Sequence, residues 1–225
     1  MFMTEILPHT WQVDPITAKN IQLTLARDIV IRDILDTPKT VAGADVSLSP
    51  DRKTLIGGFV VFSWHDLKPL TQAVCHQEAM FPYIPGLLSF REIPVLLEAW
   101  NRLEIKPDLI FCDGQGIAHP RGFGLASHLG LLLKHPTIGC AKKRLVGHHQ
   151  EVESTRGSWK PLLLDEKLIG CVLRTRDNIK PVFVSPGHLV GFDQAREFVL
   201  AACAKFRLPE PIRAAHRLVN EKRLY

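Results

Sequence analysis

The order of the predicted secondary structure constrains the fold of this 225-residue chain more than any other feature. Three apolar segments are separated only by short polar turns, which predicts an antiparallel meander over 41–48, 54–64 and 70–80. The pattern then changes, because helical and short apolar segments alternate at 93–103, 108–113, 125–134 and 137–141. Since strands that alternate with helices are usually parallel, the sequence predicts one mixed sheet with helices on its faces.

The rest of the chain completes this architecture. Periodicity predicts a helix over 16–35, a hairpin from 159–164 and 168–175, a short strand at 181–185, and a helix over 193–206 with Asp193 as its N-cap. Because there is no internal repeat or linker, we predict a single domain over 1–225. A three-strand meander followed by strand–helix units is the order of the ribonuclease H-like α/β fold.

Composition and charge narrow the setting in which the chain works. The formal net charge is +5 and 46% of the residues are hydrophobic, which is typical of a globular protein and compatible with a polyanionic partner. No apolar run is long enough to span a membrane, and residues 1–10 lack a secretory signal. Five cysteines, an odd number, lie mostly in apolar runs, which predicts buried reduced thiols and a cytoplasmic location.

A stiff apolar loop precedes the helix near residue 93. Prolines 82 and 85 restrict the backbone around Tyr83 and Ile84, and Gly86 then permits a turn. Apolar wedges of this kind are used by proteins that separate stacked bases. The alternative is a hydrophobic loop that packs on the core, because most apolar loop residues are simply buried.

Two aspartates are predicted to meet at one edge of the sheet. Asp45 interrupts an apolar strand, where an acid is costly unless it is paired or bound to a metal. Asp113 ends the buried strand 108–113, and acids at the carboxyl ends of parallel strands lie where such sheets bind ligands. If the two strands are neighbours, as the predicted order requires, both carboxylates converge on one point.

Glu92 has two interpretations. Ser89 and Glu92 match the capping-box pattern, which would make Glu92 a cap of its own helix, although Pro94 favours a later helix start. Glu92 also begins a stripe that continues with Leu96 and Trp100, so it is predicted to point toward the sheet. A carboxylate there would bind or position a metal or a water molecule.

Lys142 and a glycine-rich segment add to this predicted site. Lys142 follows the strand 137–141 on the face of Ile138 and Cys140, which places it near Asp113 at the end of the preceding parallel strand. A cation there could stabilise a developing negative charge, whereas the alternative is a solvated basic run over 142–144. The glycine-rich segment 113–124 leads into a helix whose amides could hold a phosphate, although it is no Walker A loop.

Together these residues resemble the endonuclease V family, the deoxyinosine 3′-endonucleases. The resemblance covers nearly the whole chain, and its specific parts are Ala42-Gly43-Ala44-Asp45-Val46, Pro82-Tyr83-Ile84-Pro85-Gly86, Leu88-Ser89-Phe90-Arg91-Glu92, Pro107-Asp108-Leu109 through Gly116, His119-Pro120-Arg121, Ala126-Ser127-His128, Pro136-Thr137-Ile138-Gly139 through Gly147, and Arg207-Leu208-Pro209-Glu210-Pro211. Gln115 departs from the pattern, since many members carry histidine or asparagine there, but its neighbours Asp113, Gly114 and Gly116 are intact.

The resemblance implies a role for each matching residue. Asp45, Glu92 and Asp113 match the catalytic carboxylates, with Asp45 and Asp113 as ligands of Mg²⁺, for which Mn²⁺ would substitute. Lys142 and His119 match residues near the scissile phosphate, and His216 matches a catalytic-site histidine that some members carry. The wedge is matched by Tyr83 together with Pro82, Ile84 and Pro85. The base pocket is matched by Gly86, Leu88 and Gly124.

The resemblance also implies the reaction. The family cuts the second phosphodiester bond 3′ to a deoxyinosine and leaves a 3′-hydroxyl and a 5′-phosphate. DNA containing deoxyinosine is the implied partner, with inosine-containing RNA as an open alternative, and the chain would act as a monomer. Two other functions are alternatives: a non-catalytic nucleic-acid-binding module on the same fold, which the three acids disfavour, and a sugar-kinase-like ATPase, for which a second phosphate loop is missing.

Overall fold

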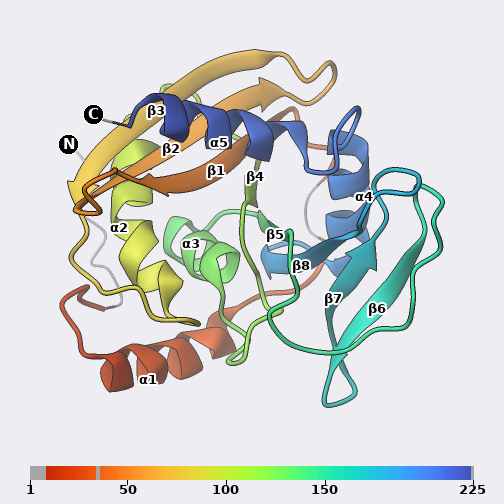
Figure 1. Ribbon diagram of the computed structural model, residues 1–225, viewed down its shortest axis with the longest axis horizontal. Helices are drawn as coiled ribbons and strands as arrows, with labels where there is room; N and C mark the ends of the chain where they lie inside the picture. The colour runs from red at the N-terminus through yellow and green to blue at the C-terminus, as the bar shows by residue number, and fades with distance from the viewer. Residues whose placement is uncertain (1–8, 34–35, 224–225) are drawn as a thin grey trace.

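A mixed sheet of eight strands organises the protein, whose computed structural model describes residues 9–33 and 36–223 (Figure 1). The spatial order of the strands is β3-β2-β1-β4-β5-β8-β7-β6. The strands are β1 (Thr40–Leu48), β2 (Thr54–Ser63), β3 (Pro69–Glu78), β4 (Leu109–Cys112), β5 (Thr137–Ala141), β6 (Trp159–Leu164), β7 (Lys167–Leu173) and β8 (Val182–His188). The predicted α/β class with a ribonuclease H-like sheet is confirmed.

Strand directions follow the prediction in the part that carries the site. β1, β2 and β3 form the antiparallel meander, and β1, β4 and β5 are parallel to one another. β8 continues the sheet antiparallel to β5, and β6 and β7 form the predicted hairpin beside it. β1 and β4 are paired so that Ala44 lies opposite Cys112, which makes Asp45 and Asp113 the next residues along each strand.

Helices cover both faces of the sheet (Figure 1). The helices are α1 (Pro15–Leu25), α2 (Leu88–Asn101), α3 (Leu125–Leu133), α4 (Phe192–Ala202) and α5 (Glu210–Glu221), with a 3-10 turn η1 (Ala26–Asp28) after α1. α2 and α3 bury apolar side chains such as Ile93 and Leu129 against Ala44 on one face. α4 and α5 bury Val199 and Ile212 against the other face.

The cysteines lie in the interior of the protein. All five are free and buried, as the apolar runs around them predicted. Among the described residues, no helix combines the length and apolar character needed to cross a membrane.

The predicted helix over 16–35 is wrong in its length. α1 ends at Leu25, and its buried side chains are Ala18, Gln22 and Leu25, whereas Ile16 is 72% exposed. Beyond η1 the chain is extended, because the Val30 carbonyl oxygen accepts a hydrogen bond from the Leu189 amide. A long-range contact therefore overrides the local helical pattern there. Residues 34–35 lie outside the described part.

The predicted N-cap Asp193 is wrong, and the capping alternative for Glu92 is excluded. α2 begins at Leu88, Pro94 lies inside it, and no side chain caps its start. α4 begins after Gly191, and Asp193 lies in its first turn, where its carboxylate forms an ion pair with Arg196.

Candidate active site

Two neighbouring parallel strands bring Asp45 and Asp113 together. Asp45 is in β1 and is 9% exposed, and Asp113 directly follows β4. The Asp113 amide donates to the Ala44 carbonyl oxygen at 3.3 Å, which extends the pairing of the two strands to the acids themselves. The convergence that the sequence predicted is therefore present.

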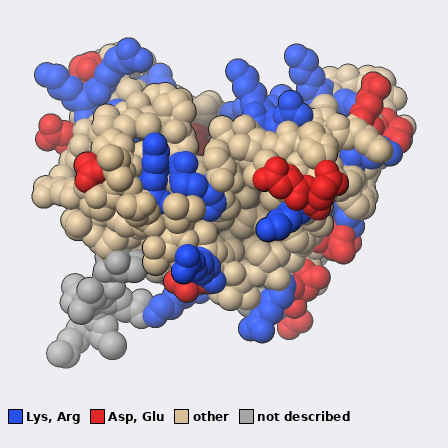
Figure 2. Space-filling view, turned by 90° about the horizontal axis from the view of Figure 1, so that it is seen from below, with Lys and Arg blue, Asp and Glu red and all other residues tan. Residues whose placement is uncertain are grey.

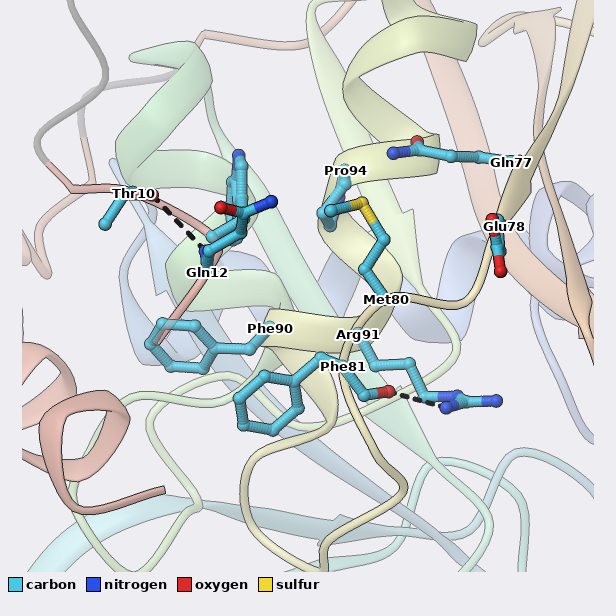
Figure 3. Close-up of a pocket in the computed structure, with 10 residues that line it drawn as sticks. Thr10, Gln12, Gln77, Glu78, Met80, Phe81, Phe90, Arg91 and Pro94 are labelled. Carbon is cyan, nitrogen blue, oxygen red and sulfur yellow. Dashed lines mark hydrogen bonds between the residues drawn. The ribbon is translucent and has the colours of Figure 1, made fainter. Parts of the chain in front are cut away.

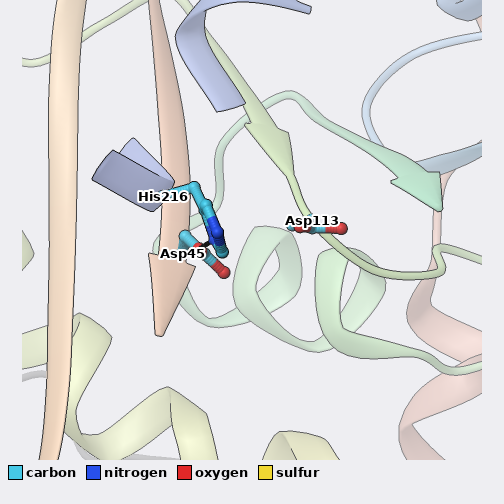
Figure 4. Close-up of side chains that lie close together, drawn as sticks. All are labelled: Asp45, Asp113 and His216. Carbon is cyan, nitrogen blue, oxygen red and sulfur yellow. Dashed lines mark hydrogen bonds and ion pairs between the residues drawn. The ribbon is translucent and has the colours of Figure 1, made fainter. Parts of the chain in front are cut away.

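Helix α5 closes over the face of β1 that carries Asp45. Gly43 permits this close approach, because a β-carbon at that position would lie 1.9 Å from the Pro211 carbonyl oxygen. The Ser47 hydroxyl donates to the Val219 carbonyl oxygen at 2.8 Å and fixes the other end of the helix. Between these contacts, His216 Nδ1 donates to Asp45 Oδ2 at 2.7 Å (Figure 4).

These three side chains form a group that could hold a metal ion. One donor atom from each of Asp45, Asp113 and His216 lies within 4.8 Å of the others. Burial, reinforced by the negative charge of Asp113, raises the pKa of Asp45 to about 6, although the hydrogen bond from His216 opposes the shift. A site that destabilises its own carboxylates in this way favours a cation between them.

Glu92 faces the same acids from the first turns of α2. Burial, followed by repulsion from Asp45 and Asp113, raises the pKa of Glu92 to about 8. The charges of Asp45 and Asp113 act on Glu92, so its carboxyl group lies near them, although it is not one of the three groups that could hold a metal ion. A carboxyl group with a pKa near neutrality can take up or release a proton at working pH.

Lys142 is directed at Asp113 and not simply into solvent. Its Nζ donates to Asp113 Oδ2 at 2.7 Å, although the side chain remains 44% exposed. The parallel pairing of β4 with β5 produces this contact, since Lys142 follows the end of β5. The lysine is therefore paired with Asp113 and also accessible from solvent.

The chemistry of these donors fits a hard divalent cation. Carboxylate oxygens are the ligands that Mg²⁺ and Mn²⁺ prefer, and Mg²⁺ retains several water molecules when two carboxylates bind it. Asp45 and Asp113 supply such oxygens, and a cation between them would relieve the repulsion that raises the pKa of Asp45. His216 orients Asp45 through its hydrogen bond, as residues behind metal ligands commonly do.

The loop before α2 has a packed root and an exposed tip. Phe81 and Leu87 are buried at its two ends, and Arg91 Nη1 donates to the Phe81 carbonyl oxygen at 2.6 Å (Figure 3). A cavity of about 220 Å³ lies beside this root, between residues 10–12, the end of β3 and the start of α2. Tyr83 at the tip is 71% exposed, so the loop is not merely packed on the core.

A larger cavity of about 350 Å³ lies between this loop and the glycine-rich segment 113–124. Six of the residues that the resemblance places at the base pocket or wedge line it, together with His119: Tyr83, Ile84, Pro85, Gly86, Leu88 and Gly124. Pro82 is exposed and does not line it. The cavity also borders Ser89 and Gly114, which lie next to the acid cluster in the chain.

Gly86 has a φ of +78°, a backbone conformation that favours glycine. Three side chains hold its carbonyl oxygen. Donors from Gln22, His119 and Arg121 converge on this oxygen at 3.1, 3.0 and 2.6 Å. Arg121 Nε also donates to Gln22 Oε1 at 2.6 Å. The structure therefore places His119 at the loop and not among the acids, and it adds Gln22 and Arg121, whose contacts with this loop no local sequence pattern predicted.

The protonation state of His119 follows from this network. Burial, and then the charge of Arg121, lowers the pKa of His119 to about 4. The neutral ring donates from Nε2 to Gly86 and accepts at Nδ1 from the Arg121 amide at 3.3 Å. Its hydrogen bonds thus require a single tautomer.

A pair of histidines supports the wall of the larger cavity at Ser89. His128 is fully buried in α3, its Nε2 lies 2.8 Å from His9 Nε2, and its Nδ1 lies 3.1 Å from the Ser89 hydroxyl. Burial lowers the pKa of His128 well below its usual value, so one neutral ring donates and the other accepts. The capping-box alternative would have used the Ser89 hydroxyl as a helix cap, but this hydroxyl contacts His128 instead.

Acids held at the ends of neighbouring parallel strands, with Lys142 and His216 bound to them, suit hydrolysis at a phosphorus centre. Fold and site together define a metal-dependent nuclease of the ribonuclease H-like class. The family model for Endonuclease V matches residues 23–217, and the chain belongs to this family. It is therefore a nuclease that hydrolyses phosphodiester bonds.

Known proteins agree with this assignment along the whole chain. Endonuclease V of Trichormus variabilis is 44% identical over 216 residues, which cover 96% of this chain and 98% of the relative. The crystal structure of Endonuclease V from Streptomyces avermitilis is 40% identical with a TM-score of 0.90, and covers 96% of this chain and 95% of its own. Ciona intestinalis Endonuclease V, solved in complex with a 24mer DNA containing an inosine followed by a ribo-adenosine, is 25% identical with a TM-score of 0.80, over 92% of this chain and 96% of its own.

Proposed function

We propose that this protein is a magnesium-dependent DNA repair endonuclease that recognises deoxyinosine. It would cut the second phosphodiester bond 3′ to the lesion and leave a 3′-hydroxyl and a 5′-phosphate. The observation that carries the proposal is the cavity of about 350 Å³ beside an exposed tyrosine, next to the acid cluster. The inosine-containing DNA bound by the Ciona intestinalis relative supports the same substrate.

The wedge and the cavity would act on the lesion. Tyr83 stands exposed on a loop whose root is packed and whose Gly86 carbonyl is held by three donors, so the ring is a stiff support for parting stacked bases. A displaced base would enter the cavity lined by Gly86, Leu88 and Gly124, whose volume lies in the range of small-ligand sites, about 300–1,000 Å³. Flipping costs least where pairing is already weak, which favours a deaminated base.

The acid cluster would cut the strand. Asp45 and Asp113 would hold Mg²⁺, which when bound polarises the phosphate and lowers the pKa of a bound water. Glu92 would orient the attacking water and take up its proton, and Lys142 would turn from Asp113 to the charge that develops on the phosphate. His216 keeps the Asp45 carboxylate in position.

The remaining proposals concern the setting of this activity. Mn²⁺ would replace Mg²⁺, because both prefer oxygen ligands. We place the enzyme in the cytoplasm, since its five free buried cysteines suit a reducing compartment, and we expect it to act as a monomer. Because all eight strands belong to one sheet, we propose that residues 1–225 act as one catalytic domain. Inosine-containing RNA is a second substrate to be compared with DNA.

Cleavage of a defined duplex tests the proposal. An end-labelled duplex with one deoxyinosine should be nicked with magnesium and left intact with EDTA, and the matched duplex with deoxyadenosine should not be nicked. Asp45→Ala should abolish nicking, whereas Asp51→Ala, at an exposed aspartate in the turn after β1, should not. Equal cutting with and without EDTA, or no cutting in either, would refute the proposal, and an RNA strand of the same sequence measures the preference between the two nucleic acids.

A further inference from the structure

A second hollow adjoins the acid cluster. This groove, of about 500 Å³, begins at Lys142 and His216, the two side chains that bind Asp113 and Asp45. It shares no lining residue with the cavity beside Tyr83, which approaches the acids from Ser89 and Gly114 instead. The two hollows meet at adjacent residues, because Lys143 and Arg144 line the cavity and Lys142, which binds Asp113, lines the groove. A strand that runs from the cavity past the acids can therefore continue into this groove.

The groove is lined by cations. Four basic side chains and His216 line it, with no acidic side chain among the described lining residues: Lys142, Arg207, Arg213 and Arg217. Arg207 donates to the carbonyl oxygens of Lys142 and Pro181, so its charge is not cancelled. Arg217 is exposed and has no hydrogen-bond or ion-pair partner among the described residues. Lys and Arg side chains also flank a hollow at the upper edge of the face in Figure 2.

An aromatic ring lies within this basic lining. Phe206, between α4 and α5, is 44% exposed, and the Arg213 guanidinium lies 3.2 Å from the centre of its ring. An ion pair with Glu210 holds Arg213 in place. Grooves that carry single-stranded nucleic acid combine these two elements, a basic track for the phosphates and an aromatic face on which a base stacks.

We propose that this groove holds the part of the cleaved strand that follows the cut, with one base stacked on Phe206 and the backbone phosphates against Arg207 and Arg217. The proposal rests on the proposed function, because the flipped base occupies the other hollow and cleavage lies 3′ to it. The part of the strand that lies 3′ to the cut then runs from the acids into the groove. Charge complementarity selects a nucleic-acid strand as the occupant, since no acidic side chain lines the groove and the charges of Arg207 and Arg217 are not paired with an acid among the described residues.

A double-mutant cycle between protein and strand tests the stacked base. Single strands with one deoxyinosine carry an abasic residue, in turn, at each of the first few nucleotides beyond the cut. At one of these positions the unaltered protein should lose about fivefold or more in kcat/KM, as expected for one stacked base. The Phe206→Ala variant should show a similar loss in kcat/KM on the strand without an abasic residue. An abasic residue at the sensitive position should not lower the kcat/KM of this variant further. Equal abasic losses in the two proteins at every position would overturn the proposal.

The chain provides a matched control for an exposed ring with a guanidinium on it. Trp159 is 42% exposed, and the Arg196 guanidinium lies 4.4 Å from its ring centre, but this pair joins the start of β6 to α4, outside the groove. Trp159→Ala should leave every value unchanged. Arg217→Gln should reduce the slope of log Kd against log salt by about 1, whereas Lys68→Gln, in the turn between β2 and β3, should not. Unchanged slopes in both would contradict the phosphate contact.

Binding separates this proposal from the proposed function. The same strands are titrated by fluorescence anisotropy with calcium in place of magnesium, which requires no cleavage. Coupling of Phe206 to one 3′ position without any cutting in magnesium would support the groove and refute the proposed function. Cutting at deoxyinosine without such coupling would refute the groove and leave the function intact. If Phe206 were coupled only to nucleotides 5′ of the lesion, the groove would hold the 5′ part of the strand, and the proposal would be overturned.

Discussion

Lowering the pH from about 7.5 to about 5 should destabilise the folded protein through His119, and His119→Gln should remove that contribution. Burial and the charge of Arg121 lower the pKa of this ring from 6.5 to about 4 in the folded chain. Below pH 6.5 the His119 ring of the unfolded chain is protonated, whereas the ring of the folded chain stays neutral until the pH falls to about 4. The stabilisation is therefore fully present above pH 6.5 and is lost as the pH falls toward 4.

The magnitude follows from these two pKa values. At about pH 5 the unfolded ring is almost fully protonated and the folded ring is almost neutral, which lowers the free energy of unfolding by about 2 kcal/mol relative to pH 7.5. Glutamine does not titrate, and its amide can still donate to the Gly86 carbonyl oxygen. The variant should therefore lose about 2 kcal/mol less than the unaltered protein over the same pH interval.

Urea denaturation at the two pH values measures this difference. Because Asp45, Glu92 and His128 titrate in both proteins, their contributions cancel when the two pH-dependent losses are subtracted. His65→Gln, at an exposed histidine in the turn after β2, is the matched control and should behave like the unaltered protein. Equal losses in the His119→Gln variant and the unaltered protein would refute the argument that the ring is held neutral around Gly86.

Three further predictions concern the site. Gly43→Ala should lower the free energy of unfolding by about 1–3 kcal/mol in thermal denaturation, because its β-carbon would lie 1.9 Å from the Pro211 carbonyl oxygen; unchanged stability would contradict the close approach of α5. Magnesium affinity measured by calorimetry should rise between about pH 6 and pH 8, as Asp45 and then Glu92 lose their protons, and Glu92→Gln should flatten the upper part of that rise. Tyr83→Ala should weaken binding of inosine-containing DNA about fivefold or more, and equal affinity would show that the exposed ring is no wedge.

Local periodicity was enough to predict the part of the sheet that carries the acids. Alternation along β1 placed Asp45 on the face opposite Ala44, and the switch to strand–helix units made β1, β4 and β5 parallel. These two facts together bring Asp45, Asp113 and Lys142 to one edge. The same local reasoning failed at residues 26–33 and at Ser89, where hydrogen bonds to distant segments replace the ones that a helix or a cap would make.

The sequence by itself determined the order of the strands and helices, the acids at the strand ends and the stiff loop with Tyr83, because these depend on the fixed periods of strands and helices and on the restrictions of proline and glycine. Only the tertiary structure decided what surrounds them. His216 reaches Asp45 across 171 residues, and Gln22 reaches the Gly86 carbonyl across 64. Such contacts depend on how closely α5 and α1 pack on the rest of the molecule, and no local pattern encodes that distance. The groove with Phe206 has the same origin, since its cations come from the end of β5, from the segment before α5 and from α5 itself.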